Sequence, residues 1–430
     1  MTPQRDQYDC VVVGGGPAGA TAAARVAQAG HSVLLLERDQ HPRPHVGESL
    51  MPESYWVFER LGVLSKLNKS AYSRKVGVQF VNHTGRESQP FFFRNHDPRD
   101  CSETWHVDRA EFDQMLFEHA RELGAECVEQ ARVTAVAFEG DRAVGVKLKA
   151  SGGDRSVACK VVVDASGQQS LIANKLGLKR VDPKLKKAAI WRHYRGAERD
   201  ESGGGVKTII AHTNDKRAWF WYIPQANDTV SVGVVADSDY LLKGGLTAEQ
   251  AFDAEVAKCD SVRRWIENAE AAPDLRVARE FSYSTDRAAG DGWVLVGDAW
   301  GFIDPVYSSG VYFALKSADM AADAVIDALR HDDLSAERLG AWAPEFTAGT
   351  KWVRKLVHAF YSGEFRVGKF VMEHPQHSGP LTDLLIGRMF SPEVPQMFED
   401  LEPWLERMIA TAGEGAIDDD AAEDSAPSFG

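Results

Sequence analysis

The sequence predicts an α/β protein in which two α/β segments enclose a β-rich insertion and continue into a helical C-terminal region. Three observations predict this arrangement. An apolar run at residues 10–13, a glycine-rich turn, an Ala-rich stretch and a second apolar run at 32–36 form a βαβ pattern. Short β-like runs dominate residues 171–275, and one long helical pattern begins at Ser309. The α/β pattern therefore belongs to a discontinuous domain that a second domain interrupts.

Length and charge limit the classes of protein that the chain can belong to. At 430 residues it has room for two or three domains, since a domain has roughly 150 residues. The formal charge of -14 argues against nucleic acid as a partner, because phosphate binding needs concentrated Lys and Arg. It also argues against docking on an anionic membrane.

Cysteine spacing predicts neither a disulfide framework nor a metal site. The five cysteines are scattered and form no CxxC pair, so we expect reduced thiols and no bound metal. The first nine residues are polar, and no run approaches the roughly 18 apolar residues of a membrane span. We expect a cytoplasmic protein that does not contact the membrane.

The first glycines form a GxGxxG motif between a strand and a helix, which is the context that dinucleotide binding requires. Gly14 permits the tight turn, Gly16 lets a pyrophosphate approach the backbone, and Gly19 allows close packing of helix and strand. The helix begins at Pro17 and Ala18, and its N-terminus carries about half a positive charge. Glu37, about 20 residues on, is placed to bind a ribose hydroxyl.

Two further strand ends narrow the choice of dinucleotide. Residues 161–163 lead into Asp164, and residues 293–296 lead into Gly-Asp-Ala with Asp298. An Asp there can bind a ribityl chain, which FAD has and NAD lacks. Over residues 8–330 the chain resembles the FAD monooxygenase-type flavoproteins, which are built like aromatic hydroxylases.

This resemblance implies a Rossmann-type FAD-binding domain with an inserted β-rich substrate domain and a helical C-terminal region. The FAD-binding domain would comprise 1–75, 105–170 and 276–335, and the substrate domain 76–104 and 171–275. A helical region would cover 336–411. The acidic tail, 412–430, has almost no apolar bulk, so we expect it to be disordered.

The resemblance also implies the residues that contact FAD. They are Gly14, Gly16, Pro17, Ala18, Gly19, Glu37, Arg38, Glu48, Arg109, Val133, Asp298 and Gly310. Only one dinucleotide fingerprint is visible, so either NADH binds transiently or, as we expect, a separate flavin reductase supplies reduced FAD.

Three features point to a narrower family. Residues 219–224 match WxWxIP through Trp219 and Trp221, Lys75 precedes an apolar β-like run, and residues 304–311 open the long helix. With Gly-Glu-Ser at 47–49, this set looks like the flavin-dependent halogenases, specifically the branch that acts on phenol- or pyrrole-type rings. Such substrates are often tethered to a carrier protein.

Membership of that branch implies a reaction and a role for each motif. Reduced FAD, oxygen and chloride or bromide would give hypohalous acid, with the halide ion bound at Ser309 and Gly310. Lys75 would be catalytic, either donating a hydrogen bond to hypohalous acid or forming a haloamine. The substrate pocket would contain Trp219, Trp221, Pro305, Tyr307 and Ser308.

Two positions depart from the family pattern. Tryptophan halogenases carry a catalytic Glu where this chain has Tyr307, which favours a phenolic or pyrrolic substrate over free tryptophan. Trp300 stands directly after Gly-Asp-Ala, where the family usually has a small residue. The resemblance therefore does not predict the shape of the cofactor entrance. The aromatic helical pattern over 352–372 is either core packing or a lid over the substrate cavity.

Other functions are compatible with the same fold. A flavin hydroxylase would insert oxygen, a prenyl-chain reductase would need a long apolar tunnel, and a silent flavin-binding protein would turn over no substrate. The sequence does not determine whether the halide is chloride or bromide, or whether the substrate is free or bound to a carrier. It also does not determine the oligomeric state.

Overall fold

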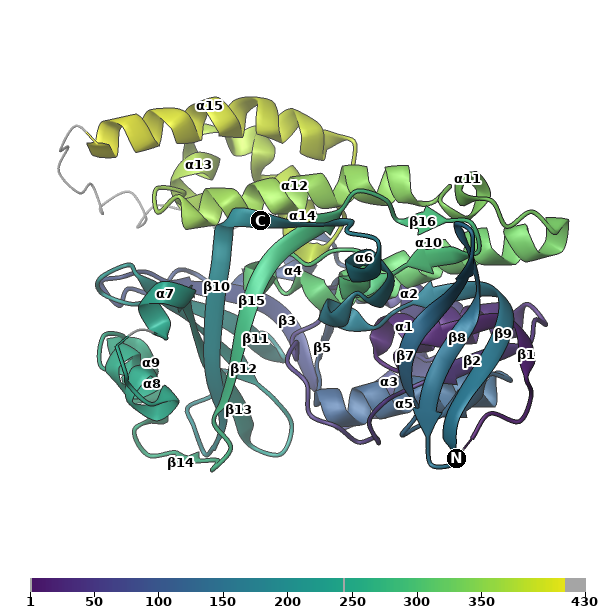
Figure 1. Cartoon of the computed structure of the whole chain (residues 1–430). Coiled ribbons are helices and arrows are strands. Elements are labelled where there is room, and N and C mark those ends of the chain that lie inside the picture. Colours follow the sequence, from purple (N-terminus) through teal and green to yellow (C-terminus); the bar gives the residue numbers. More distant parts are fainter. Residues whose placement is uncertain (1, 243, 414–430) are drawn as a thin grey trace.

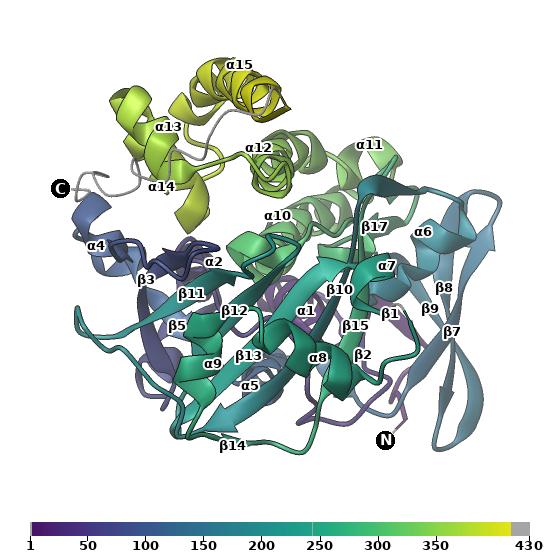
Figure 2. The ribbon, with the colours of Figure 1, turned by 90° about the vertical axis from the view of Figure 1, so that its left-hand side faces the viewer.

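The computed structural model describes residues 2–242 and 244–413, and these residues form two β-sheets that lie side by side (Figure 1). A group of C-terminal helices (residues 343–413) lies at one end of the second sheet (Figure 2). This arrangement confirms the predicted α/β class and the helical C-terminal region.

The first sheet is built on parallel strands whose side chains are buried on both faces. Its central order is β16-β17-β9-β1-β2-β6, and β7 and β8 continue from β9 as an antiparallel meander. The strands are β1 (Gln7–Val13), β2 (Val33–Leu36), β6 (Glu126–Val128), β7 (Arg132–Glu139), β8 (Arg142–Ala150), β9 (Gly153–Asp164), β16 (Ala289–Gly290) and β17 (Trp293–Leu295). Near-continuous apolar strands of this kind are typical of a parallel sheet that helices cover.

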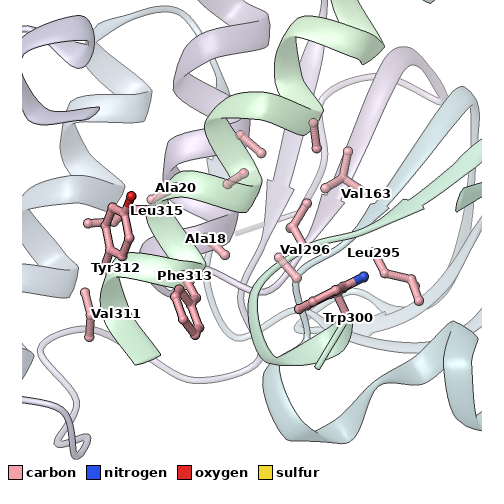
Figure 3. Packing of buried hydrophobic residues seen from close by; sticks show 14 of the residues in the cluster. Ala18, Ala20, Val163, Leu295, Val296, Trp300, Val311, Tyr312, Phe313 and Leu315 are labelled. Carbon is pink, nitrogen blue, oxygen red and sulfur yellow. The ribbon is translucent and has the colours of Figure 1, made fainter. Parts of the chain in front are cut away.

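Helices from distant parts of the chain pack on this sheet. They are α1 (Pro17–Gln28), α2 (Ser54–Leu61), α3 (Leu64–Asn68), α5 (Arg109–Glu122), α6 (Leu171–Lys175), α10 (Ser309–His331) and α11 (Ala336–Leu339). Figure 3 shows Ala18 and Ala20 of α1 close to Leu315 of α10. Small residues on α1 let the two helices approach each other, and the cofactor turn therefore lies beside the start of α10.

The second sheet supplies the wall opposite the first. Its order is β14-β10-β13-β12-β11-β3-β4, with β15 on β10 and β5 on β3. The strands are β3 (Ser73–Val81), β4 (Phe91–Phe92), β5 (Thr104–His106), β10 (Lys179–Arg195), β11 (Val206–His212), β12 (Ala218–Pro224), β13 (Thr229–Asp237), β14 (Glu270–Ala271) and β15 (Arg276–Thr285). The expected domain boundaries at 75 and 276 thus fall within β3 and at the start of β15, both strands of this sheet.

One face of the second sheet is closed by two short helices. They are α8 (Ala248–Val256) and α9 (Asp260–Ile266), which are separate helices because Cys259 between them adopts an extended backbone. The short helices α4 (Phe93–His96) and α7 (Ser238–Leu241) flank the sheet. With one face covered, the opposite face is left to line a cavity.

The C-terminal helices are α12 (Ala343–Tyr361), α13 (Val367–Glu373), α14 (Ser378–Ile386) and α15 (Glu393–Gly413). The last of them extends two residues beyond the expected end of the helical region at 411, and residues 414–430 of the expected tail lie outside the described residues. Trp300 is buried and packs edge-to-face on Phe346 of α12, with ring centroids 5.0 Å apart. Figure 3 places it in the same core cluster as Val296 and Phe313. Its bulk thus fills the core.

Within residues 2–242 and 244–413, none of the helices combines the length and the apolar character that a membrane span requires.

The backbone of the glycine turn packs so closely on its neighbours that it leaves no room for side chains at two of its positions. Gly14 has φ +107°, and a Cβ there would lie 2.3 Å from the carbonyl oxygen of Ala165. A Cβ on Gly19 would lie 1.8 Å from the carbonyl oxygen of Gly14. Gly14 therefore needs both the left-handed backbone and the missing side chain.

We predict that Gly14→Ala lowers the melting temperature much more than Gly30→Ala. Both glycines have positive φ, but a Cβ at Gly30 meets nothing within 4 Å. Gly30→Ala should therefore cost only about 1 kcal/mol of backbone strain, whereas Gly14→Ala adds a clash with Ala165, directly after β9. Thermal unfolding of the two variants measures the difference; equal shifts would show that the close approach at Ala165 is not a constraint.

Candidate active site

A cavity of about 530 Å³ lies where the glycine turn, the second sheet and the start of α10 meet. Residues from all parts of the predicted site line it. They are Gly14, Gly16, Pro17, Ala18, Glu37, Arg38, Glu48, Arg109, Val133, Trp219, Trp221, Asp298, Pro305, Ser308 and Gly310. Four predicted residues lie behind the wall: Gly19, Lys75, Tyr307 and Ser309.

The end of the cavity at α1 suits an anionic group. A Cβ on Gly16 would meet only Nη2 of Arg43, at 3.6 Å, so backbone N–H groups at the start of α1 stay accessible. Glu37 is buried and accepts hydrogen bonds from the backbone N–H of Gly15 (2.7 Å) and of Asp39 (2.9 Å). Glu37 therefore holds the glycine turn in place, in addition to the ribose-binding role that the sequence predicts.

Arg109 fixes the middle of the same wall. Its guanidinium forms a two-point ion pair with buried Asp113 (2.8 and 3.0 Å) and donates to the carbonyl oxygen of Val46. Although burial opposes it, the charge of Arg109 holds the pKa of Asp113 below its usual value. The pair ties the loop that carries Glu48 to α5.

Two carboxylates on the wall have unused acceptor capacity. Burial raises the pKa of Asp298 to about 6, and no described side chain donates a hydrogen bond to its carboxylate. Glu48 accepts from Nε2 of His193 (2.6 Å) through Oε1, while its buried Oε2 has no partner among the described residues. Acceptors of this kind suit the hydroxyl groups of a ribityl chain. Together with the open face of Gly16, the site fits FAD.

The WxWxIP strand turns alternate side chains into the cavity. Trp219, Trp221 and Ile223 on β12 line it, whereas the residues between them pack against α8 and α9. Gly233 lies opposite Trp221 on β13, and a Cβ there would lie 2.2 Å from the indole. The indole thus needs the glycine beside it.

A hydrogen-bonded bridge connects this strand to the start of α10. Nε1 of Trp219 donates to Oη of Tyr361 (2.9 Å), and Oη of Tyr361 donates to buried Asp304 (2.9 Å). Burial raises the pKa of Asp304 to about 6. The end of α12 therefore fastens Trp219 to the turn that precedes α10. The apolar side chains of the 352–372 pattern pack in or against the core.

The start of α10 presents groups that suit a small anion. Ser309 is fully buried and its Oγ has no partner among the described residues, while a Cβ on Gly310 would project into open space. Ser308, with φ +60°, faces the cavity. Tyr307 was expected in the substrate pocket, but this turn sends its ring behind the wall, with Oη 3.5 Å from the carbonyl oxygen of Leu356.

Lys75 lies one residue behind the cavity wall. It is 3% exposed, and Nζ donates to Oγ of Ser49 and to the carbonyl oxygen of Leu50, both at 2.9 Å. Ser49 itself lines the cavity. Because no carboxylate in the described part of the chain pairs with it, burial lowers the pKa of Lys75 to about 7.

The donor and the acceptor of each hydrogen bond that follows from Lys75 can be assigned. Nδ1 of buried His106 is 2.7 Å from the carbonyl oxygen of Pro224, which can only accept, so Nδ1 carries the proton. Burial, with the charge of Lys75, lowers the pKa of His106 to about 3, so its Nε2 is an acceptor. Oγ1 of Thr208 (2.8 Å) therefore donates to His106 and accepts from Ser49 (2.8 Å).

This Lys75 chain (Lys75, Ser49, Thr208, His106 and Pro224) ends at the proline of WxWxIP. The sequence predicted Lys75 but assigned no role to Ser49, Thr208 or His106. Ser49 follows Glu48 in a motif already singled out, and Thr208 occupies an inward position of β11. Only the pairing of β3 with β5 and β11 brings these residues together.

One cluster in the described part of the chain could hold a metal, although the sequence predicts none. Ligand atoms of His374, His377 and Asp400 lie within 4.8 Å of one another on the C-terminal helices. His377 forms a 2.7 Å hydrogen bond with Asp400. None of the three lines the cavity.

Comparison with known proteins supports what this geometry suggests. Residues 7–334 match the FAD binding domain family. A 1H-pyrrole-2-carbonyl-(peptidyl-carrier protein) chlorinase of Pseudomonas fluorescens is 31% identical over 89% of this chain and 90% of its own length. A brominase of the same substrate description from Pseudoalteromonas luteoviolacea is 33% identical over 80% of this chain and 82% of its own.

The chain belongs to the flavin-dependent halogenases. The solved structure of the flavin-dependent brominase Bmp2 superimposes with a TM-score of 0.82 at 30% identity, covering 93% of this chain and 99% of that one. The expectations of a halogenase, of FAD and of a halide are confirmed, and the hydroxylase, reductase and silent-protein alternatives are not favoured.

We predict that Thr208→Val lowers halogenation at least tenfold and leaves FAD affinity within about twofold. The change keeps the side chain's shape but leaves Ser49 without its acceptor and His106 without its donor, each a loss of about 1–3 kcal/mol. Steady-state halogenation and FAD titration measure the two effects.

Thr382→Val is the matched control, since Thr382 is equally buried and its hydroxyl bonds only to its own helix, at Ser378. It should halogenate at the normal rate. Equal rates for the two variants would contradict a role for the Lys75 chain.

Proposed function

We propose that this halogenase substitutes chlorine or bromine on a pyrrole- or phenol-type ring that a carrier protein presents as a thioester. The observation that carries the proposal is the single cavity into which the glycine turn, the WxWxIP strand and the start of α10 all open. The carrier-bound substrate is supported by the two relatives named for pyrrole-2-carbonyl carriers.

FAD, reduced by a separate flavin reductase, supplies with oxygen the oxidising power that converts halide into hypohalous acid. The chain itself has to bind the halide without a metal. We place the halide at the start of α10, where unpaired backbone N–H groups, the helix dipole and the unpartnered Oγ of Ser309 converge. Gly310 leaves the space open for it.

Trp219 and Trp221 divide the cavity in the proposed reaction. Their indoles line it, and the bridge through Tyr361 to Asp304 holds Trp219 in place. An aromatic substrate behind them is kept away from the cofactor, whereas hypohalous acid is small enough to pass. This separation favours halogen transfer over direct oxygen insertion.

Lys75 takes up the halogen in the proposed reaction. Two N–H groups of its ammonium donate to Ser49 and Leu50, so the proton that it loses near pH 7 comes from the third N–H group. Above that pH the nitrogen has a lone pair in this direction. The amine then attacks hypohalous acid: an N–halogen bond forms, the O–halogen bond breaks, and the hydroxide takes one N–H proton and leaves as water. The ring carbon takes the halogen, its C–H proton returns to the nitrogen, and Lys75 is restored.

The ring needs no strong base at the site. Burial raises the pKa of Tyr307 well above its usual value, so its phenol stays neutral and cannot replace the carboxylate of tryptophan halogenases. A pyrrole or phenol is already electron-rich enough to be attacked without such help.

Mass spectrometry tests the function. The protein is incubated with a flavin reductase, NADH, FAD, bromide or chloride, and either carrier-bound pyrrole-2-carbonyl, free pyrrole-2-carboxylate or simple phenols. We expect the halogen isotope pattern on the carrier-bound ring. A product carrying an added oxygen and no halogen would contradict the proposal, and efficient turnover of only the free acids would contradict the carrier.

We predict that Lys75→Met abolishes halogenation yet stabilises the fold at pH 7. The folded pKa of about 7 lies below the usual 10.5, so the unfolded chain binds more protons between these values. Stability of the wild type should therefore fall as the pH drops from 10.5 to 7, at up to about 1.4 kcal/mol per pH unit, and this slope should vanish in Lys75→Met.

Lys207→Met is the control, because Lys207 is equally buried on the neighbouring strand but is paired with Asp200 (2.5 Å) and Ser202 (2.9 Å). That variant should lose stability and keep its halogenation. Chemical denaturation across the pH range and product formation measure both; normal halogenation by Lys75→Met would overturn the assignment.

A further inference from the structure

Two histidines flank a single 3₁₀ turn between α13 and α14. His374 directly follows α13, and His377 is the last residue of the turn Pro375–His377. Because a 3₁₀ helix has three residues per turn, side chains three positions apart lie on the same side of it. The two imidazole rings accordingly stack, with their centroids 6.1 Å apart and 27° between their planes.

Asp400 of α15 faces the two histidines. Its Oδ2 lies 2.7 Å from Nε2 of His377 and 3.9 Å from Nδ1 of His374. Ligand atoms of the three residues all lie within 4.8 Å of one another. Figure 2 shows α13, α14 and α15 grouped together at the C-terminal end of the fold. We refer to the three residues as the His-Asp cluster.

Aromatic packing fixes the orientation of both imidazoles. The fully buried ring of Phe370 stacks on His374 and on His377, with centroid distances of 5.1 and 5.9 Å. Trp404, one helical turn after Asp400, packs edge-to-face on Phe370 at 5.4 Å. The three potential ligands therefore stand on a common aromatic base, and little side-chain freedom is lost when they bind an ion.

The charges around the His-Asp cluster suit a cation. Within residues 2–242 and 244–413, the ion pairs of Asp400 are with the two histidines, and no lysine or arginine pairs with it. The side chain of Asp400 is 48% exposed and that of His374 is 22% exposed, so an ion can enter from solvent. The carboxylate is thus accessible and is not neutralised by a permanent positive charge.

The ligand atoms select the class of metal. Two imidazole nitrogens and one carboxylate oxygen suit Zn²⁺, whereas Mg²⁺ and Ca²⁺ prefer oxygen ligands alone. Ligands bound about 2.0–2.2 Å from a tetrahedral Zn²⁺ lie about 3.4 Å apart. The distances of 2.7 and 3.9 Å to Asp400 lie on either side of this value, so small side-chain rotations bring the atoms into place.

We propose that the His-Asp cluster binds Zn²⁺ through His374, His377 and Asp400, with water in the fourth position. The ion replaces the hydrogen bond between His377 and Asp400, and the proton of that bond passes to solvent. It joins the turn after α13 to α15 and so fastens the C-terminal helices to one another. None of the three ligands lines the active-site cavity, so the ion takes no part in halogen transfer.

Calorimetric titration of the FAD-loaded full-length protein with Zn²⁺, after treatment with a chelator, tests the site. We expect one Zn²⁺ per chain. His374→Gln and Asp400→Asn should each weaken Zn²⁺ binding at least tenfold, and Mg²⁺ should bind the wild type at least tenfold more weakly than Zn²⁺ does.

Thermal unfolding provides a second readout. Zn²⁺ in excess should raise the melting temperature of the wild type by roughly 2 °C or more, because it binds the folded chain, and should leave both variants unshifted. Without metal, the two variants should melt within about 2 °C of the wild type, since they replace partly exposed side chains. This comparison separates the loss of a ligand from misfolding.

A second His–Asp pair of the same helical region provides the matched control. Nε2 of His96 lies 2.8 Å from Oδ1 of Asp383, but a guanidinium nitrogen of Arg388 is 3.7 Å from that oxygen. In the part of the chain that the structure describes, this pair has no third metal ligand beside it. His96→Gln should therefore leave Zn²⁺ affinity unchanged.

Four results would overturn the site. They are the absence of Zn²⁺ binding to the wild type, unchanged Zn²⁺ affinity in either His374→Gln or Asp400→Asn, equal affinity of the wild type for Mg²⁺ and Zn²⁺, and an equal loss of Zn²⁺ binding in His96→Gln.

Discussion

The burial of one amine without a counter-ion is the constraint on which the arrangement of the active site depends. Lys75 can be buried only because Ser49 and Leu50, both from the FAD-binding half, accept its hydrogen bonds. Ser49 in turn is fixed through Thr208 and His106 to Pro224 in the second sheet. The same bonds therefore hold the two halves of the cavity together, while burial lowers the pKa of the amine to about 7.

A second connection closes the cavity from the C-terminal side. Tyr361, at the end of α12, accepts from Trp219 and donates to Asp304, so the helical region positions the WxWxIP strand against the start of α10. The halide turn and the tryptophans depend on an element that contributes no predicted catalytic group. The same tyrosine lines a second cavity, of about 340 Å³, which shares Trp219 with the first.

The sequence was enough to predict the fold and the residues with local signals. Gly14, Gly16 and Asp298 lie at strand ends, where a turn and a close approach leave a pattern in consecutive residues. The partners of Lys75 come from three separate segments, so only strand pairing reveals them. Tyr307 was expected on the substrate wall, but the left-handed backbone of Ser308 turns the chain there.

The central claim, that Lys75 takes up the halogen as a neutral amine, can be tested by trapping. The FAD-loaded protein, with its reductase, NADH, oxygen and bromide but without an aromatic substrate, is quenched after one turnover, digested and mapped by mass spectrometry. The account predicts a bromine isotope pair on the peptide that contains Lys75, with a yield that rises as the pH passes through 7. Bromine spread over exposed lysines, with none on Lys75, would contradict it.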